Sequence, residues 1–322
     1  MPRHNQPRRG SLQFWPRTRA KKILPSANWD ALEKQRKKPG VLGLIAYKAG
    51  MKSAIVKDNT EHSLTKGKRI IIPVTILEVP PLKIFSVRFY KHHLPIKEII
   101  VSTDKELKKR LKVPKQTKKF EDVLGNIKDY DDIHILVYSI VNKTGIKKAP
   151  DLAEVALGGT KEEKLETAKK FINKEISLSD LIGFFENKLM DVHGVTKGHG
   201  TQGPVKRFGI KLRFHKTEKG QRKVGSIGPW HPARVTFRVP MAGQMGFFTR
   251  LTYNNGIIAS GKISEKNINP EGGFKHFGEI KTDFLILNGS VPGPQKRQLL
   301  LTTTLRPTKK QTKKNYEFLE LR

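Results

Sequence analysis

The sequence predicts a mainly β protein that carries an α/β insertion and long basic extensions outside its core. Segments rich in Val, Ile, Phe and Tyr, which favour strands, lie in both halves of the chain. Patterns that start helices occur between residues 95 and 180. The most basic stretches, 1–39 and 191–246, are interrupted by Pro or Gly. We therefore expect a β framework with a modest core, an insertion within it, and basic segments beyond it.

The net charge restricts the class of partner. The chain has 63 Lys and Arg against 29 Asp and Glu, a formal net charge of +34. Such a charge repels itself in a compact protein and implies a negatively charged partner, either nucleic acid or an anionic membrane. The longest apolar stretches, such as 42–47 and 70–77, are far shorter than the roughly 20 residues of a spanning helix. We expect no membrane association, although a basic amphipathic surface helix is a formal alternative.

The start of the chain and its cysteine content bear on its compartment. Residues 1–5 are basic, but no apolar segment follows them, so they are not expected to form a secretory signal. The chain has no Cys, which excludes a disulfide framework and Cys-ligated zinc. This composition fits a reducing cytosol.

The first 39 residues are predicted to form a basic N-terminal arm. Residues 1–38 hold 11 Lys and Arg against Asp30 and Glu33, and several prolines break any helix. The arm also holds Phe14, Trp15 and Trp29, aromatic residues that are rare in free tails. We expect an extended arm that becomes ordered against RNA; the alternative is a solvated, disordered tail.

The strand-forming segments predict how the rest of the chain is divided into barrel and insertion. The sequence favours strands over 40–47, 69–79, 83–90, 133–141, 247–253, 256–263, 284–287 and 299–305. Pro80-Pro81 indicates a sharp reversal of the kind found in a closed, curved sheet. The expected order is a first barrel segment over 40–95, the insertion over 96–180, a return to the barrel over 181–190, and a second barrel segment over 247–305.

Two helix starts lie within the insertion, and a basic tail ends the chain. Residues 103–106 (TDKE) and 160–163 (TKEE) fit the capping-box pattern, and apolar residues follow each at helical spacing. Residues 306–322 are expected to form a basic tail that ends in a short amphipathic segment.

The basic internal extension over 191–246 carries the strongest functional signal. It combines many Lys, Arg and Gly with little periodic hydrophobicity, and irregular stretches of this length in a compact domain are usually functional. Its basic residues suit phosphate contacts and counterion release. Trp230 lies between Pro229 and Pro232, where a stiff aromatic group could stack on a base. Packing of Trp230 on its own protein is the alternative.

Several segments resemble enzyme or cofactor-binding motifs, but the residues around them do not fit those motifs. Residues 198–203 (GHGTQG) fit the dinucleotide-binding spacing, but no amphipathic helix or suitably spaced acid follows them. Residues 256–263 nearly match a phosphate-binding loop, but Ile263 occupies the position of the Mg²⁺-binding hydroxyl. The closest His groupings, His92 with His93 and His193 with His199, lack metal-ligand spacing. We expect no catalytic, cofactor or metal site.

A set of Gly, His, Trp and Pro motifs then identifies a family by resemblance. These residues are Phe184, Asp191, Gly194, Thr196, Gly198, His199, Gly200, Gly203 and Arg207, with 225–228 (GSIG), 230–232 (WHP), 241–246 (MAGQMG), 47–51 (YKAGM), 269–270 (NP), 272–274 (GGF) and 289–294 (GSVPGP). In order and spacing they resemble the universal large-subunit ribosomal protein L-three family. The resemblance covers nearly the whole chain, and its motifs are highly specific.

The resemblance implies a fold and a function. It implies a translation-protein-type β-barrel with an α/β insertion and long N-terminal and internal extensions. Family members bind large-subunit rRNA (23S-type) near its 3′ end, help to nucleate subunit assembly, and extend toward the peptidyl-transferase centre. The implied protein neighbours are ribosomal proteins L-fourteen and L-twenty-four-e, in the cytoplasmic large ribosomal subunit. No cofactor or small-molecule substrate is implied, beyond Mg²⁺ held by the rRNA.

The pattern resembles archaeal members most, with two departures from the family. Residues 230–232 (WHP) are similar to archaeal and eukaryotic members, and the longer C-terminal region of eukaryotic members is absent. Lys52 stands where Thr is usual, and Glu218 stands where eukaryotic members can carry a modifiable His. That modification is therefore not expected here.

Charge and resemblance together mark the candidate rRNA-binding residues. In the arm they are Arg3, Arg8, Arg9, Arg17, Arg19, Lys21 and Lys22. In the internal extension they are Lys197, His199, Lys206, Arg207, Lys211, Arg213, Lys216, Lys219, Arg222, Lys223, Trp230, His231, Arg234, Arg238 and Gln244. An RNA-modifying enzyme and a general nucleic-acid-binding protein are the alternative functions.

Overall fold

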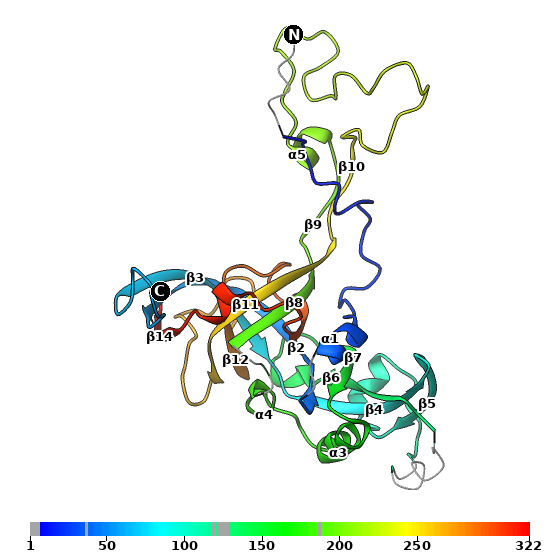
Figure 1. Ribbon diagram of the computed structural model, residues 1–322, viewed down its shortest axis with the longest axis vertical. Helices are drawn as coiled ribbons and strands as arrows, with labels where there is room; N and C mark the ends of the chain where they lie inside the picture. Colours follow the sequence, from blue (N-terminus) through cyan, green and yellow to red (C-terminus); the bar gives the residue numbers. More distant parts are fainter. Residues whose placement is uncertain (1–6, 36–37, 118–119, 121–128, 184, 186–187) are drawn as a thin grey trace. The chain divides into compact units, whose positions relative to one another are not determined.

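The computed structural model describes residues 7–35, 38–117, 120, 129–183, 185 and 188–322. The chain divides into two compact units (Figure 1). The main unit comprises Ile23–Gly194 and Arg250–Arg322, and the extension unit comprises Val195–Thr249 with the chain up to Lys22. No helix among the described residues is long and apolar enough to cross a membrane.

The main unit is built on a closed barrel of six strands. Around the ring they are β2 (Gly43–Asp58), β3 (Arg69–Val79), β12 (Asp283–Asn288), β11 (Thr249–Lys262), β8 (Leu189–Val195) and β13 (Gln298–Thr303). Strand β13 pairs with both β8 and β2, which closes the ring. Closure satisfies the backbone groups that an open sheet would leave at its edges. The predicted mainly β fold is confirmed, and the segments expected at 247–253 and 256–263 form one strand, β11.

A second, antiparallel sheet packs beside the barrel. Its order is β1 (Gly40–Val41), β7 (Leu152–Gly158), β6 (Asp132–Ser139), β4 (Leu82–Lys91) and β5 (Leu94–Ile100). The Tyr47 hydroxyl on β2 donates to the Asp151 carboxylate at 2.6 Å, and it lies 2.8 Å from the Ser139 hydroxyl. The first half of β2 is therefore buried on both faces.

The second sheet begins earlier in the chain than the expected boundary at residue 96. Strand β4 starts at Leu82, immediately after Pro80-Pro81, and pairs with β6 and β5 instead of with a barrel strand. The two prolines cannot donate ladder hydrogen bonds, so β3 ends at Val79 and the chain leaves the barrel there.

The two predicted helix starts differ in outcome. At 160–163 the Thr160 hydroxyl and the Glu163 carboxylate form both bonds of a capping box, which begins α3 (Lys161–Phe171). The expected helix after residue 103 is only a 3-10 turn, η1 (Lys105–Lys109), with no side-chain cap. Glu106, the acid of the expected box, instead accepts a hydrogen bond from the Asn142 side-chain amide, and the carboxylate of Asp104, which is the observed N-cap, accepts one from the Tyr138 hydroxyl. Both acids are therefore used by distant residues, and the local capping signal does not form a helix.

Both ends of the main unit are more ordered than the sequence suggested. Within the predicted arm, α1 (Trp29–Gln35) buries Trp29 and Leu32 in the core, because its apolar side faces the protein. Within the predicted basic tail, after the short helix α6 (Lys309–Thr312), β14 (Tyr316–Leu321) pairs with β2. The partly buried Phe318 packs against the core, so the amphipathic end of the chain forms a strand. The unit also contains the short helices η2 (Val141–Lys143) and α4 (Leu178–Ile182).

Candidate nucleic-acid interface

A two-stranded ribbon forms the base of the extension unit. Strand β9 (Gly198–Gln202) pairs with β10 (Gly243–Gly246), and helix α5 (Pro204–Phe208) follows β9. Gly246 has a φ of +74°, and a Cβ there would lie 2.0 Å from the Lys197 carbonyl oxygen, so only glycine fits. The residues with dinucleotide-binding spacing therefore form a ribbon strand. They do not form the strand-to-helix phosphate loop that such a cofactor requires.

Arg207 ties the two sides of this base together. Its Nε donates to the Gln244 carbonyl at 3.0 Å, and its Nη1 donates to the Met241 carbonyl at 2.9 Å. Its guanidinium also lies 5.1 Å from the centre of the Phe208 ring. Partial burial, and secondly the charge of Arg17, lower the pKa of Arg207.

The described start of the chain packs onto the extension unit. Trp15 lies between the rings of Phe208 and Phe237, with ring centres 6.2 and 6.0 Å away. Arg17 lies 4.2 Å above the Phe208 ring and donates to the Arg207 carbonyl at 3.0 Å. This part of the arm is therefore ordered by aromatic and cation–π contacts within the protein. Phe208 and Phe237 were not among the predicted site residues, and their aromatic character was the available signal.

The chain between α5 and β10 is an exposed loop that displays aromatic side chains. Trp230 is 84% exposed, Phe214 67% and Phe237 59%. Beside Trp230 is a hollow of about 320 Å³, lined by Ile227, Gly228, Pro229, Ala233, Arg234 and Val235. The exposure of Trp230 argues against the alternative in which its ring packs on its own protein.

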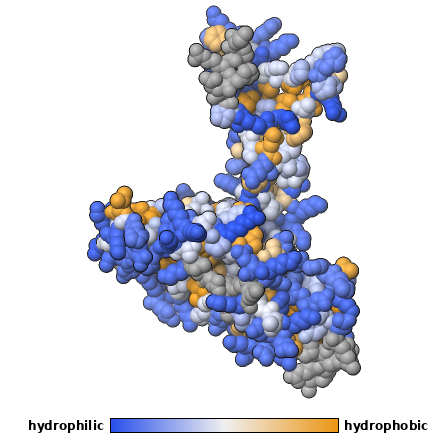
Figure 2. All heavy atoms as spheres, in the orientation of Figure 1, coloured by the Kyte–Doolittle hydropathy of each residue, from blue (hydrophilic) through white to orange (hydrophobic). Residues whose placement is uncertain are grey.

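The charge of the extension unit is almost entirely of one sign. Residues 7–22 and 195–249 contain 17 Lys and Arg, and Glu218 is their one acid. These cations therefore have almost no partner of opposite charge within the unit, and an external anion is needed to neutralise them. Figure 2 shows hydrophilic side chains beside apolar ones over this unit.

The comparison with known proteins identifies the family. The model of the family described as Ribosomal protein L3 matches residues 1–321. This chain belongs to that family. The predicted resemblance is confirmed.

Curated relatives named "Large ribosomal subunit protein uL3" match this L3 family member along its length. The protein of Methanothermobacter thermautotrophicus is 38% identical over 97% of this chain and 95% of its own length. The protein of Methanobrevibacter smithii is 39% identical (96% and 95%), and that of Methanocaldococcus jannaschii is 40% identical (94% and 92%). These relatives are archaeal, as the sequence predicted, and the family is one of ribosomal proteins, not of enzymes.

Most predicted rRNA-binding residues of this L3 family member are exposed. These are Arg8, Arg9, Arg19, Lys21, Lys22, Lys197, His199, Lys206, Lys211, Arg213, Lys216, Lys219, Arg222, Lys223, Trp230, His231, Arg234 and Arg238. Arg17, Arg207 and Gln244 are half-buried and make bonds within the unit. Arg3 lies outside the described residues. Contact of each residue with rRNA stays a prediction.

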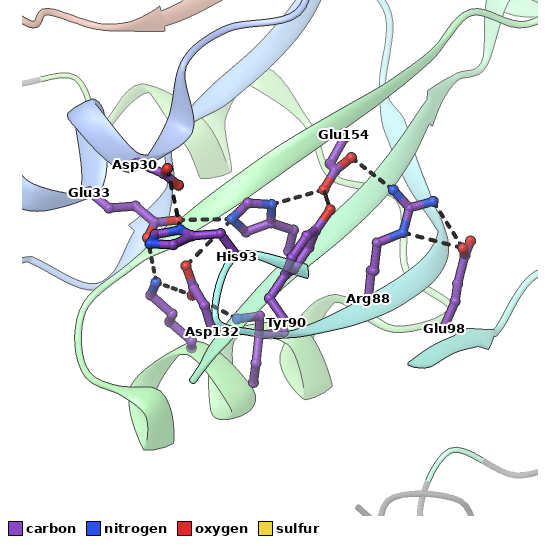
Figure 3. Close-up of polar contacts among 11 residues, drawn as sticks. Asp30, Glu33, Arg88, Tyr90, His93, Glu98, Asp132 and Glu154 are labelled. Carbon is purple, nitrogen blue, oxygen red and sulfur yellow. Dashed lines mark hydrogen bonds and ion pairs between the residues drawn. The ribbon is translucent and has the colours of Figure 1, made fainter. Parts of the chain in front are cut away.

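A second polar cluster, in the main unit, was missed at the sequence level. His134 on β6 is buried, with Nδ1 2.9 Å from Glu154 on β7 and Nε2 3.2 Å from Glu33 on α1. Figure 3 shows the labelled carboxylates of Glu33, Asp132 and Glu154 in this cluster. Hydrogen bonds from both ring nitrogens to carboxylates, led by Asp132 and opposed by burial, raise the pKa of His134 to about 10. The ring is therefore a buried imidazolium that joins three elements.

This cluster has metal-ligand side chains but is already neutralised by cations. Glu33, Asp132 and His134 form the one group of three such residues among the described residues. The Lys164 ammonium contacts Glu33 at 3.1 Å and also contacts Asp132. With the imidazolium and this ammonium among the carboxylates, the cluster is built as an ion-pair network. No sequence spacing signalled it, because Glu33 lies 101 positions from His134.

Proposed function

We propose that this chain is a structural constituent of the large ribosomal subunit and binds its rRNA through the extension unit. The observation that supports this most is the excess of basic residues in 7–22 and 195–249, which hold 17 Lys and Arg against one acid, with most of the basic side chains exposed. Multiple lysines and arginines along one segment neutralise phosphates and release their counterions. The names of the relatives support the same assignment.

The architecture of the unit suits threading into folded RNA. Arg207 and the β9–β10 ribbon hold the two ends of the loop between α5 and β10 together, and that loop presents exposed cations and Trp230. Exposed aromatic rings stack on unpaired bases, and cations hold the neighbouring phosphates. The same proposal includes binding near the 3′ end of the rRNA, a role in nucleating assembly, and reach toward the peptidyl-transferase centre.

We also propose that this chain has protein neighbours in the subunit. Ribosomal proteins L-fourteen and L-twenty-four-e are proposed to lie beside the chain in the subunit. The proposed function needs no cofactor and no small-molecule substrate, and any Mg²⁺ involved is held by the rRNA.

Salt dependence of rRNA binding tests the proposal. Binding of the full chain to a 3′-region rRNA fragment is measured over a range of salt, beside a variant with Lys206, Lys211 and Arg213 changed to Gln. We expect the slope of log affinity against log salt to fall by about one unit per lost phosphate contact. Lys161, Lys169 and Lys170 on α3 of the main unit, changed to Gln together, provide the charge-matched control.

Two results would contradict the proposal. An unchanged slope in the extension variant would mean that its cations do not contact phosphates. Equal affinity for duplex DNA of the same length would favour a general nucleic-acid-binding protein instead.

A further inference from the structure

A group of lysines lies on the surface of the main unit, around the 3-10 turn η1. Residues 105–115 hold six Lys and Arg, and the Lys109 ammonium donates to the Lys148 carbonyl at 3.1 Å, which places Lys148 beside them. Six of these lysines are exposed, and among the described residues none of the six forms an ion pair. We call them the η1 patch: Lys105, Lys108, Lys109, Lys112, Lys115 and Lys148.

The two acids of the same segment are used within the protein. The Asp104 carboxylate accepts a hydrogen bond from the Tyr138 hydroxyl and lies 3.4 Å from the Lys83 ammonium. The Glu106 carboxylate accepts a hydrogen bond from the Asn142 side-chain amide. These partners lie outside the η1 patch, so neither acid is bonded to one of its lysines. The positive charge of the patch therefore faces solvent without a counter-charge.

The segment is anchored, so its lysines are held close together. Leu107 is fully buried and forms a small apolar cluster with Phe85 and Tyr138. The Arg110 guanidinium contacts the buried Asp151 carboxylate at 3.4 Å. Such anchoring keeps like charges near one another, which is unfavourable unless an anion is present. An anion from outside the chain would relieve this repulsion.

The chemistry of the η1 patch favours a phosphate backbone as its partner. Lysine is depleted in protein–protein interfaces, and within 105–115 only Leu111 is an exposed apolar side chain. The segment has no aromatic residue, so it lacks the stacking group that Trp230 supplies in the extension unit. A lysine ammonium is a point charge that binds phosphate oxygens without reading bases. RNA contacted through its backbone fits this surface better than an acidic protein segment does.

We propose that the η1 patch is a second rRNA contact, in which its lysines hold phosphates of the RNA backbone. This goes beyond the proposed function, which assigns RNA binding to the extension unit. It rests on that function only in taking the RNA to be that of the large subunit. The patch and the extension belong to separate units of the chain, so their contributions to the binding free energy should be nearly additive.

Salt titration of binding to the complete large-subunit rRNA tests the patch. The full chain is compared with a variant in which Lys105, Lys108 and Lys112 are changed to Gln. We expect the slope of log affinity against log salt to fall by about one unit for each phosphate contact that is lost. The charge-matched control changes three lysines of α3 to Gln and should leave the slope nearly unchanged: Lys161, Lys169 and Lys170.

Two further measurements separate lost charge from altered structure. Changing the same three lysines of the patch to Arg keeps each charge and should retain the slope of the original chain. All three positions are exposed, so the Gln variant should have nearly the thermal midpoint of the original chain. A slope that falls in the Arg variant as far as in the Gln variant would contradict a contact made through charge.

Directed cleavage then locates the RNA in assembled subunits. The chain has no Cys, so Lys112→Cys provides a single attachment point for an iron chelate, whose hydroxyl radicals cut the nearby RNA backbone. We expect cuts in large-subunit rRNA around this probe. If the radicals cut another protein and no rRNA, an acidic protein covers the patch and the proposal is overturned.

The failure of this proposal can be separated from the failure of the proposed function. The variant with Lys206, Lys211 and Arg213 changed to Gln is titrated on the same rRNA. If the slope falls in that variant but not in the η1 variant, or falls no further in the η1 variant than in the α3 control, the η1 patch is overturned and the proposed function stands. If it falls in the η1 variant alone, RNA binding through the extension fails instead.

Discussion

Nη1 of Arg207 donates a hydrogen bond to the Met241 carbonyl at 2.9 Å, across the base of the loop that carries Trp230. Arg207 was predicted to bind phosphate, but its Nε and Nη1 are both used within the protein. Bonds from a charged donor to backbone carbonyls are stronger than neutral ones and hold two chain segments together. Arg207 thus fixes the base of the loop, whereas its neighbour Lys206 points an exposed cation outward.

Arg207→Gln and Lys206→Gln should therefore have different effects. We expect Arg207→Gln to weaken the β9–β10 base by about 1–3 kcal/mol while leaving the salt slope of rRNA binding nearly unchanged. Lys206→Gln should lower the slope by about one unit and leave the base intact. Hydrogen exchange of the β9 and β10 amides and salt titrations measure the two effects. A lowered slope and unchanged exchange in Arg207→Gln would assign that residue to phosphate contact instead.

Trp230→Ala should affect RNA binding without affecting folding. The ring is 84% exposed, so its removal should change the free energy of unfolding by no more than about 0.5 kcal/mol. If the ring stacks on a base, rRNA affinity should fall by about 1–3 kcal/mol. Filter binding and denaturant unfolding measure these quantities, with Trp230→Phe retaining part of the stacking. Full affinity in Trp230→Ala would exclude a stacking role.

The His134 network should make stability sensitive to alkaline pH. The pKa of His134 is about 10 in the folded chain, against roughly 6.5 when it is unfolded. Its contribution to stability is thus fully present below about pH 6.5 and is lost as the pH rises through 10. His134→Gln should cost about 3–5 kcal/mol at pH 6, because buried carboxylates lose their partner.

Comparison with this variant isolates the contribution of His134. The free energy of unfolding is measured in urea at pH 6, 8 and 10.5 for both chains. The difference between them should shrink toward pH 10.5, since other titrating groups affect both chains alike. A difference that stays constant with pH would mean that His134 is not charged in the folded state.

Gly246→Ala should disrupt the extension unit alone. The added Cβ would lie 2.0 Å from the Lys197 carbonyl oxygen, at a φ of +74° that side chains rarely adopt. We expect faster proteolysis within residues 195–249 and an unchanged thermal midpoint of the barrel. Gly220→Ala, also at positive φ but with open space around it, is the matched control and should have the smaller effect.

Local residue patterns predicted the individual strands well. Strand β3 has the bounds expected from its Val and Ile content, and α3 begins at the predicted capping box. The helix expected after residue 103 was wrong, because Glu106, the acid of the expected capping box, binds Asn142, a residue 36 positions away. The expected tail at 316–321 is a strand because β2 offers it an edge. Local signals are decisive only where no distant residue competes for the same group.

The sequence by itself determined the class of partner and the family of this protein. A net charge of +34 concentrated in an arm and an internal extension requires a polyanion, and the ordered motifs specify the family. The tertiary structure decided what each charge does. It assigned Arg207 and Arg17 to holding the extension unit, left Lys206 exposed, and gathered Glu33, Asp132 and Glu154 around His134. The type of a residue fixes the sign of its charge. Whether that charge is paired within the protein or left for an external partner depends on neighbours that only folding brings within hydrogen-bond distance.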